Sequence, residues 1–298
     1  MTKMKIAIIG AGKWGQALYH AYSQNNDVVI NSRSTKNIEN FVSLEEALSC
    51  EYLVMAIPAQ AVRGWMEANF VDKGQKLLVA AKGIETSTGS FLNEVYGKFV
   101  SEDRLAFISG PSFAAEVQKS LPTALKISST NLELAQTFVD ALPSFIKGYV
   151  HDDVVGAEVA GAYKNVIAIA GGVCDGLELG NNARAALISR GLVEMTRFGE
   201  HFGAKSETFL SLGGAGDLFL TASSQLSRNY RVGLGLAKGK NLEEILEELG
   251  EVAEGIPTTK ALYNISEKEE IYLPIAHEVH NMLEGKDPLV CVKDLLNA

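Results

Sequence analysis

Lys164 and Asn165 are the polar pair with the clearest chemical potential, because they interrupt a stretch of small and apolar residues. The helical spacing of those residues predicts a helix over residues 154–173. An amine taken out of water loses solvation, so its pKa falls and it can exchange a proton near neutral pH. Such a group could take the hydroxyl proton of a secondary alcohol during hydride transfer, or donate it in the reverse direction. The alternative, which the residue types alone favour, is a lysine that keeps its ammonium in solvent.

A second candidate group follows the glycine-rich stretch 213–216. Asp217 opens a predicted helix over residues 217–226, so Thr221 would stand one turn above it on the same face. The aspartate could orient Lys164 or bind substrate hydroxyls. It could also cap the helix, which is a common role for Asp after glycines, and the two roles can coexist.

A third candidate group is Ser227-Arg228-Asn229, at the start of a predicted helix over residues 228–238. Ser227 is a suitable cap, and the N–H groups of the first turn together with the Arg228 guanidinium would hold a phosphate dianion. The alternative is an exposed basic helix start, which the spacing alone favours.

The segment Gly10-Ala11-Gly12-Lys13-Trp14-Gly15 directly follows the apolar run Lys5–Ile9. Gly10 permits a tight turn, Gly12 lets the backbone approach a pyrophosphate, and Gly15 lets the next helix pack on the strand. Free N–H groups at the start of that helix would then hold the phosphates. The context of strand, turn and helix favours dinucleotide binding over a plain structural loop.

The next predicted strand ends in Asn31-Ser32-Arg33-Ser34 and has no acidic residue there to hold the ribose 2′-OH of NAD. Arg33 could accept the 2′-phosphate of NADP, or it could be a solvated turn residue. NADPH is therefore the expected cofactor, with NADH as the alternative.

These residues lie on two halves with different patterns. Residues 1–151 alternate short apolar runs with helical segments, which predicts an α/β Rossmann-type domain with a mostly parallel sheet. The predicted strands are Lys5–Ile9, Val28–Ile30, Tyr52–Ile57, Lys76–Ala81, Leu105–Ile108 and Ala124–Ile127, with helices over Gln16–Gln24, Leu44–Leu48, Gln60–Ala68 and Glu133–Leu142.

Residues 152–298 show helical spacing throughout and predict an all-α substrate-binding and catalytic domain. Besides the three segments above, the predicted helices cover 183–202, 242–249, 258–267 and 274–283, and Gly255-Ile256-Pro257 is expected to mark a joint between helices.

The composition narrows the class of protein. A formal net charge of -9 argues against a nucleic-acid or membrane-surface partner. Three widely spaced cysteines fit a reducing cytoplasm, and we expect no leader peptide and no membrane span. The five histidines show no metal-ligand pattern, so no metal is expected.

Considered together, eight segments resemble bacterial NAD(P)-dependent glycerol-3-phosphate dehydrogenase over nearly the whole chain. They are Gly10–Gly15, Ala81-Lys82-Gly83, Ser109-Gly110-Pro111-Ser112-Phe113-Ala114, Lys164–Ala168, Asn182–Ile188, Gly216-Asp217-Leu218, Ser227-Arg228-Asn229 and Val252-Ala253-Glu254-Gly255.

The resemblance implies the reversible reduction of dihydroxyacetone phosphate to sn-glycerol 3-phosphate, which supplies glycerophospholipid synthesis. It implies Lys164 as proton donor or acceptor, with Lys82 and Asp217 as further catalytic groups. The substrate contacts it implies are Lys82, Gly110, Ser112, Lys164, Asn165, Asp217, Thr221, Ser227, Arg228 and Asn229. The cofactor contacts it implies are Gly10, Gly12, Lys13, Trp14, Gly15, Arg33, Lys82, Ala114, Arg228, Val252 and Glu254. A homodimer through the helical half is also expected.

The chain departs from the family pattern at three places. Lys13 stands where Ser is common, Gln16 stands where Thr is frequent, and the segment between Ser34 and Leu44 is short. The last departure alters the adenosine side of the cofactor site. Two rival functions remain: a related hydroxyacid dehydrogenase, and a non-catalytic NADP-sensing protein that would not need Lys164, Asp217 and Arg228 together.

Overall fold

The computed structural model describes residues 3–297, and the chain forms two compact units. One comprises the chain up to Ala81 together with Leu92–Ala157, and the other comprises Lys82–Phe91 together with the chain from Glu158 onward. We call them the sheet unit and the helical unit. The chain passes from one unit to the other between Ala81 and Lys82, between Phe91 and Leu92, and inside one long helix between Ala157 and Glu158.

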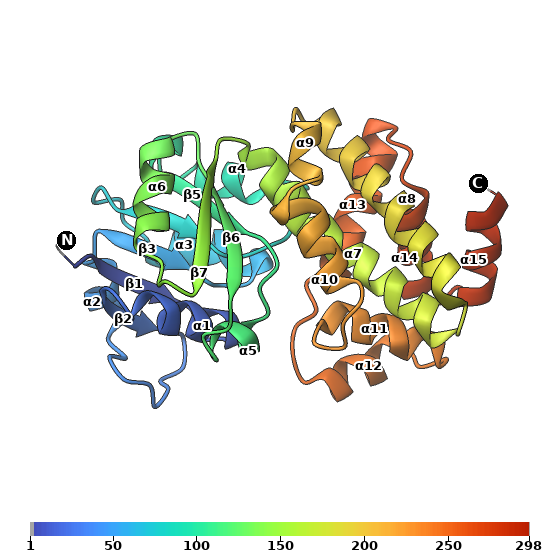
Figure 1. Ribbon diagram of the computed structural model, residues 1–298, viewed down its shortest axis with the longest axis horizontal. Coiled ribbons are helices and arrows are strands. Elements are labelled where there is room, and N and C mark those ends of the chain that lie inside the picture. Colours follow the sequence, from blue (N-terminus) through green and yellow to red (C-terminus); the bar gives the residue numbers. More distant parts are fainter. Residues whose placement is uncertain (1–2, 298) are drawn as a thin grey trace. The chain divides into compact units, whose positions relative to one another are not determined.

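Within the described residues, the sheet unit holds a seven-stranded sheet in the order β2-β1-β3-β4-β5-β6-β7 (Figure 1). Strands β5 and β6 pair antiparallel, whereas the other neighbouring strands of this sheet pair parallel. The chain passes from β1 to β2 on one side and then to β3 on the other, so the switch point of the topology lies where β1 ends. The strands are β1 Lys5–Ile9, β2 Asp27–Asn31, β3 Tyr52–Met55, β4 Lys76–Val79, β5 Leu105–Ser109, β6 Thr123–Ser128 and β7 Ile146–His151.

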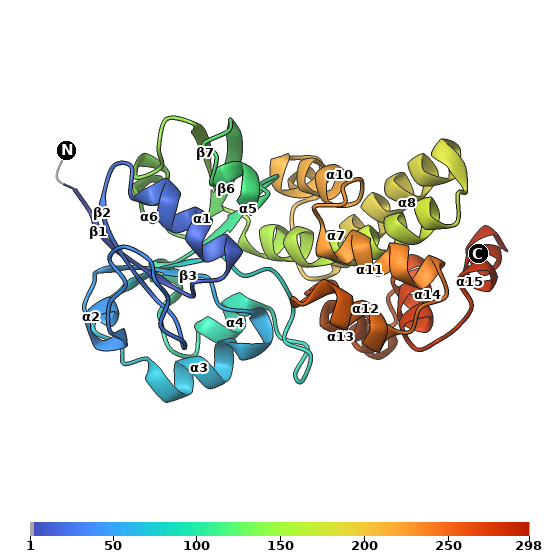
Figure 2. The same ribbon diagram turned by 90° about the horizontal axis from the view of Figure 1, so that it is seen from below.

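Helices cover both faces of this sheet, because its strands carry apolar residues on both sides (Figures 1 and 2). One core is shared with α1 (Lys13–Tyr22), α5 (Ala114–Val117) and α6 (Leu132–Asp140). The other core is shared with α2 (Leu44–Leu48), α3 (Val62–Asn69) and α4 (Leu92–Tyr96). The predicted Rossmann-type α/β arrangement is thereby confirmed.

Three elements of the sheet unit escaped the sequence prediction. Strand β7 is an edge strand whose Lys147 and Tyr149 are exposed, so it offers no continuous apolar run. Helices α4 and α5 are too short, at five and four residues, to show a helical period. The prediction of a mostly parallel sheet is confirmed, with the single antiparallel pair β5–β6 as the exception.

The regular elements of the helical unit, over the described residues, are helices. They are α7 Val154–Gly176 (whose first turn belongs to the sheet unit), α8 Gly180–His201, α9 Ser206–Phe209, α10 Asp217–Thr221, α11 Arg228–Ala237, α12 Leu242–Leu249, α13 Gly255–Glu269, α14 Pro274–Leu283 and α15 Pro288–Asn297, with a π-helical turn over Leu212–Gly216.

The prediction of an all-α second half is confirmed, with four differences in its elements. The predicted helix 217–226 is wrong in its length, because α10 ends at Thr221. The predicted joint Gly255-Ile256-Pro257 is wrong in its position, because the joint between α12 and α13 covers residues 250–254 and Pro257 lies in the first turn of α13, where a missing N–H breaks no helical bond. The short α9 and the final α15 were not predicted.

Helix α7 packs against α11 with direct backbone contact. A Cβ at Gly172 would lie 2.0 Å from the Tyr230 carbonyl oxygen, and one at Gly233 would lie 2.0 Å from the Ile169 carbonyl oxygen. Only glycine therefore fits at these two positions. The contact fixes the start of α11 relative to the helix that carries Lys164.

Among the described residues, no helix combines the length and the apolar character that crossing a membrane requires.

Candidate active site

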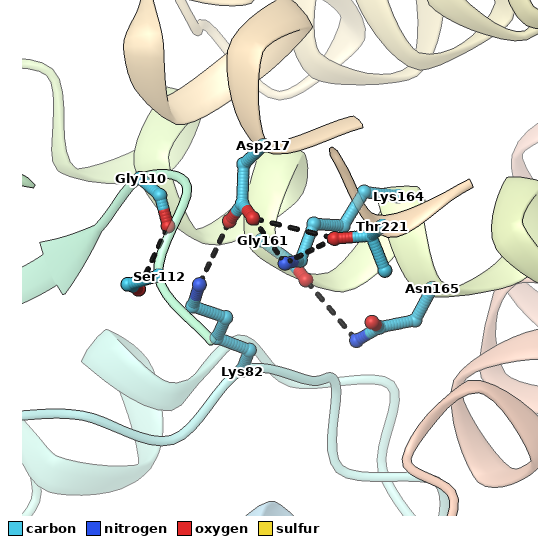
Figure 3. Close-up of polar contacts among 8 residues, drawn as sticks. All are labelled: Lys82, Gly110, Ser112, Gly161, Lys164, Asn165, Asp217 and Thr221. Carbon is cyan, nitrogen blue, oxygen red and sulfur yellow. Dashed lines mark hydrogen bonds and ion pairs between the residues drawn. The ribbon is translucent and has the colours of Figure 1, made fainter. Parts of the chain in front are cut away.

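Two lysines share one carboxylate in the helical unit (Figure 3). Lys164 Nζ of α7 donates to Asp217 Oδ1 at 2.5 Å and to Thr221 Oγ1 at 2.9 Å. Lys82 Nζ donates to the other oxygen, Asp217 Oδ2, at 2.7 Å. Thr221 Oγ1 also lies 3.3 Å from Asp217 Oδ1, as expected for residues one helical turn apart.

The Lys164 amine is buried, with a relative exposure of 7 % for the residue, so the alternative of a solvated ammonium is wrong. Burial is the main cause that lowers the pKa of Lys164; with the positive charge of Lys82 acting in the same direction and Asp217 opposing both, the pKa falls to about 7. The amine can therefore hold or release a proton near neutral pH.

The Asp217 carboxylate stays ionised although it is 1 % exposed. Burial alone would raise the pKa of this carboxyl, but the charges and hydrogen bonds of Lys164 and Lys82 bring the pKa below its ordinary value. Asp217 is the first residue of α10, and its side chain makes no capping bond to that helix. The contact with Lys164 that the orienting role requires is present, whereas the predicted cap is not.

The absence of a side chain at Gly161 lets Lys82 pack closely against α7. Gly161 lies one turn before Lys164 on α7, and a Cβ there would come within 3.4 Å of the stem of Lys82. The amide of Asn165 donates to the Gly161 carbonyl at 3.2 Å and is buried. Asn165 thus lies beside the two-lysine group, with its amide directed at the backbone of its own helix (Figure 3).

The start of α11 forms a second polar group in the same unit. Ser227 Oγ accepts from the Tyr230 N–H at 3.2 Å, so the predicted cap is confirmed. The side chain of Arg228 is 43 % exposed, and its Nη1 lies 3.6 Å from Glu251 Oε2. The α11 start therefore presents a half-exposed guanidinium beside the first-turn N–H groups of a capped helix.

Asn229 connects this helix start to the segment 252–255. Its Oδ1 accepts from the Gly255 N–H at 2.9 Å, and a Cβ at Gly255 would lie 2.7 Å from the same oxygen. Val252, with 55 % exposure, and Glu254, immediately before α13, are thereby held next to α11.

The sheet unit carries a cradle that fits a dinucleotide. Gly10 has φ +110°, and a Cβ there would lie 2.4 Å from the Ala56 carbonyl oxygen; a Cβ at Gly15 would lie 1.8 Å from the Gly10 carbonyl oxygen. A Cβ at Gly12 would meet no atom within 4 Å, so the backbone is open there. The turn leads into α1 at the switch point, with no acidic residue in the first turn of this helix. A phosphate fits this position because first-turn N–H groups point out of the helix.

The end of β2 carries an amide and is followed by a guanidinium, with no acidic side chain among residues 31–34. Asn31 turns its amide to the Val42 carbonyl at 2.9 Å, and Arg33 is exposed. Residues 40–42 run beside β2 through hydrogen bonds to Ile30, so the short segment after β2 forms a close loop and not a helix.

The other sequence-predicted residues of the sheet unit lie on loops and helix starts. Gly110 has φ +121° and its carbonyl accepts from Ser112 Oγ at 3.0 Å (Figure 3). Ala114 begins α5, and Lys13 and the half-buried Trp14 begin α1.

The structure thus brings Lys82, Lys164, Asn165, Asp217 and Thr221 together, and brings Ser227, Arg228 and Asn229 together with residues 251–255. Glu251 was not predicted, since nothing in its spacing distinguishes it from the neighbouring glutamates of α12. Gly255 stood out in the sequence only as part of a segment, and its contact with Asn229 could not be foreseen. Among the described residues, no group of three or more His, Cys, Asp or Glu side chains could hold a metal ion.

Two family models match the chain. Residues 20–135 match the model described as the NAD-dependent glycerol-3-phosphate dehydrogenase N-terminus, and residues 153–293 match that of the C-terminus. The NAD(P)+ glycerol-3-phosphate dehydrogenase of Sulfurimonas denitrificans is 61% identical over 293 residues, 98% of this chain and 99% of that protein. The enzyme of the same name from Campylobacter lari is 58% identical over 295 residues, 99% of this chain and 98% of that protein.

Solved structures give the same result. The glycerol-3-phosphate dehydrogenase of Coxiella burnetii is similar with a TM-score of 0.90 and 33% identity, over 99% of each chain. The corresponding structure from Plasmodium falciparum has a TM-score of 0.85 at 20% identity, over 98% of this chain and 94% of that one, and supports the fold alone.

Proposed function

The chain belongs to the family of NAD-dependent glycerol-3-phosphate dehydrogenases, and from this we propose that it reduces dihydroxyacetone phosphate to sn-glycerol 3-phosphate with NAD(P)H. The observation that carries the proposal is the buried Lys164 amine on a carboxylate whose second oxygen binds Lys82. Relatives at 55–61% identity carry the name of this oxidoreductase.

In the reductive direction, Lys164 donates the Nζ proton to the carbonyl oxygen of the substrate. A reduced nicotinamide, when bound, would supply the hydride for the carbonyl carbon, and together with the Lys164 proton this would convert the ketone into the secondary alcohol. Asp217 and Thr221 hold the amine in place, and the neutral amine left behind takes a proton from solvent before the next turnover. In the oxidative direction the neutral Lys164 accepts the hydroxyl proton.

The substrate offers little apolar surface, so charged groups supply its affinity and orientation. We assign the phosphate to the α11 start, with the Arg228 guanidinium and the first-turn N–H groups as ligands. Lys82 is assigned to the reacting end, where its ammonium on Asp217 adds positive charge beside Lys164. Asn165, Asn229, Gly110 and Ser112 are assigned as further substrate contacts.

The cofactor is assigned to the glycine turn of the sheet unit, with the pyrophosphate on the start of α1. Residues Lys13, Trp14, Ala114, Val252 and Glu254 are assigned as further contacts. NADPH is the preferred form in this proposal, because β2 ends in Asn31 and is followed by the exposed Arg33, and the segment 31–34 has no acidic residue for the ribose 2′-OH. NADH is the alternative cofactor in this proposal.

The proposal also covers the roles of the two domains, the cellular compartment and the oligomeric state. We take residues 1–151 as the domain that supplies most of the cofactor contacts and residues 152–298 as the domain that supplies most of the substrate contacts. The three cysteines are free, which suits a reducing cytoplasm, where the product would supply glycerophospholipid synthesis. We expect a homodimer through the helical unit, which light scattering on the purified protein checks.

The deciding experiment compares two substrates with two cofactors. Initial rates of NADPH or NADH consumption are measured with dihydroxyacetone phosphate and with unphosphorylated dihydroxyacetone. Turnover that requires the phosphate, with a higher kcat/KM for NADPH, supports the assignment. Equal kcat/KM for the two substrates would overturn the phosphate assignment, and equal or better use of NADH would overturn the NADPH preference. Turnover of a hydroxyacid in place of both substrates would identify the rival dehydrogenase.

A further inference from the structure

Residues 82–91, which we call the strap, belong to the helical unit although they lie in sequence between β4 and α4 of the sheet unit. The strap carries Lys82 at its first position. Its packing therefore determines where the Lys82 ammonium lies relative to Asp217 and Lys164.

The far end of the strap is anchored by an aromatic contact. Phe91 is 5 % exposed, and its ring meets Phe202 edge-on at 5.2 Å and Phe198 at 6.3 Å between centroids. Phe198 lies in the last turn of α8, and Phe202 directly follows this helix. Such edge-to-face pairs add stabilisation beyond the burial of the ring.

The middle of the strap is tied to α13. Thr86 Oγ1 donates to the Pro257 carbonyl at 3.1 Å, and Pro257 lies in the first turn of α13. Within the strap, the Glu85 N–H donates to the Ser90 carbonyl at 3.0 Å, and Ile84 forms a bridge with Phe91. Contacts with α8 and α13 therefore hold the strap in place. The hydrogen bond and the bridge within the strap also join its two ends to each other.

The first residue of the strap meets α7 and α10. The Lys82 stem lies on Gly161, and its ammonium meets Asp217 with the Lys82 side chain 19 % exposed. A lysine on a flexible stem has many conformations, so a fixed backbone beneath it is needed to keep the ammonium on one oxygen.

We propose that Thr86 and Phe91 are positioning residues for the reaction: by docking the strap on α13 and α8 they hold the Lys82 ammonium on Asp217 beside the reacting amine of Lys164. The expected kinetic effect rests on the proposed function. The contacts that hold the strap all lie within the helical unit. The proposal makes the two-lysine group a property of the helical unit, independent of the nucleotide cradle.

Displacement of Lys82 has a signed effect on Lys164. The charged groups that act on the Lys164 amine are Asp217 of α10 and Lys82 of the strap, and the charge of Lys82 lowers the pKa of Lys164. Weaker holding of Lys82 therefore raises that pKa. In alcohol oxidation, which needs the neutral amine, the acid limb of the rate profile then moves to higher pH.

The test compares Thr86→Val, which removes the hydroxyl and keeps the shape, with Thr86→Ser, which keeps the hydroxyl. The loss of one neutral hydrogen bond predicts a fall in kcat of about three- to tenfold for Thr86→Val. We also expect a higher-pH acid limb, an unchanged Kd for NADPH, and near-complete rescue in Thr86→Ser. Phe91→Leu should shift the limb in the same direction. Thr196→Val is the matched control, because Thr196 of α8 is also half-buried and donates to a backbone carbonyl.

A second readout needs no turnover. The rate at which acetic anhydride acetylates Lys82, followed by mass spectrometry, should rise about three- to tenfold in Thr86→Val and stay unchanged in Thr86→Ser and Thr196→Val. Unchanged acetylation of Lys82 in both Thr86→Val and Phe91→Leu would overturn the positioning role, whatever the activity. Faster acetylation in a protein that does not reduce dihydroxyacetone phosphate would uphold the strap and overturn the proposed function.

Discussion

At the scale of single residues, the chemistry depends on one amine that is kept from water. Lys164 is the group whose burial outweighs its attraction to Asp217, so its pKa falls to about 7. An ordinary surface lysine would stay protonated at every physiological pH and could not accept a proton from the alcohol.

This pKa gives opposite pH dependences for the two directions. Below pH 7 the amine is protonated and can donate, so reduction of dihydroxyacetone phosphate should be fastest there and should fall above pH 7. Oxidation of sn-glycerol 3-phosphate needs the neutral amine and should rise over the same range. Single-turnover rates measure this without interference from product release. Rates that stay constant between pH 6 and 9 in both directions would contradict the role of Lys164.

The Arg228 guanidinium gives a second prediction at this scale. Arg228→Ala should raise the KM for dihydroxyacetone phosphate about ten- to hundredfold, because a hydrogen-bonded charge pair with the phosphate is lost. Arg228→Lys should recover only part of this loss, since lysine lacks the planar fork. Glu251→Gln should lower the same KM, because it removes the carboxylate 3.6 Å from the guanidinium.

Steady-state kinetics on the purified variants check this prediction, with Arg190→Ala of the exposed face of α8 as control. An Arg228→Ala enzyme with the KM of the unaltered protein would exclude Arg228 from the phosphate site.

At the scale of elements, the position of α11 depends on its contact with α7. Gly172→Ala should lower the thermal midpoint and the free energy of unfolding by about 1–3 kcal/mol, because the new Cβ would collide with the Tyr230 carbonyl. Gly64→Ala is the matched control: Gly64 lies in α3 with no atom within 4 Å of a Cβ, and alanine there should stabilise the fold by about 0.5–1 kcal/mol. Unfolding followed by circular dichroism measures both. A Gly172→Ala protein as stable as the unaltered chain would show that the helices can separate at no cost.

Elements with a regular apolar period were predictable from the sequence. The run Lys5–Ile9 and the helical patterns 242–249 and 274–283 have the bounds of β1, α12 and α14. The edge strand β7 was not predictable in this way, because its exposed Lys147 and Tyr149 dilute the apolar run. The packing of the strap was also not predictable, because the residues it contacts lie on α8 and α13, far away in the sequence, and produce no pattern within residues 82–91.

At the scale of the whole molecule, the site is assembled from distant parts of the chain. Lys82 and Asp217 are separated by 135 positions, and Lys164 and Asp217 by 53. From their own residue types, Lys164, Asp217 and Arg228 each allowed an ordinary structural role, and Lys82 showed no signal of its own. The family resemblance added Lys82 to the candidates and favoured the functional role for the other three, and the fold then placed two lysines on one carboxylate.

The most direct test of the account uses Lys164→Ala in parallel with the exposed-lysine control Lys268→Ala. Stopped-flow measurement of NADPH oxidation by dihydroxyacetone phosphate should show a rate about 10²- to 10⁴-fold lower for Lys164→Ala, as expected for the loss of a general acid. Fluorescence titration should give it an unchanged Kd for NADPH, and Lys268→Ala should match the unaltered enzyme in both measurements. A Lys164→Ala enzyme that reduces dihydroxyacetone phosphate at close to the full rate would contradict the account.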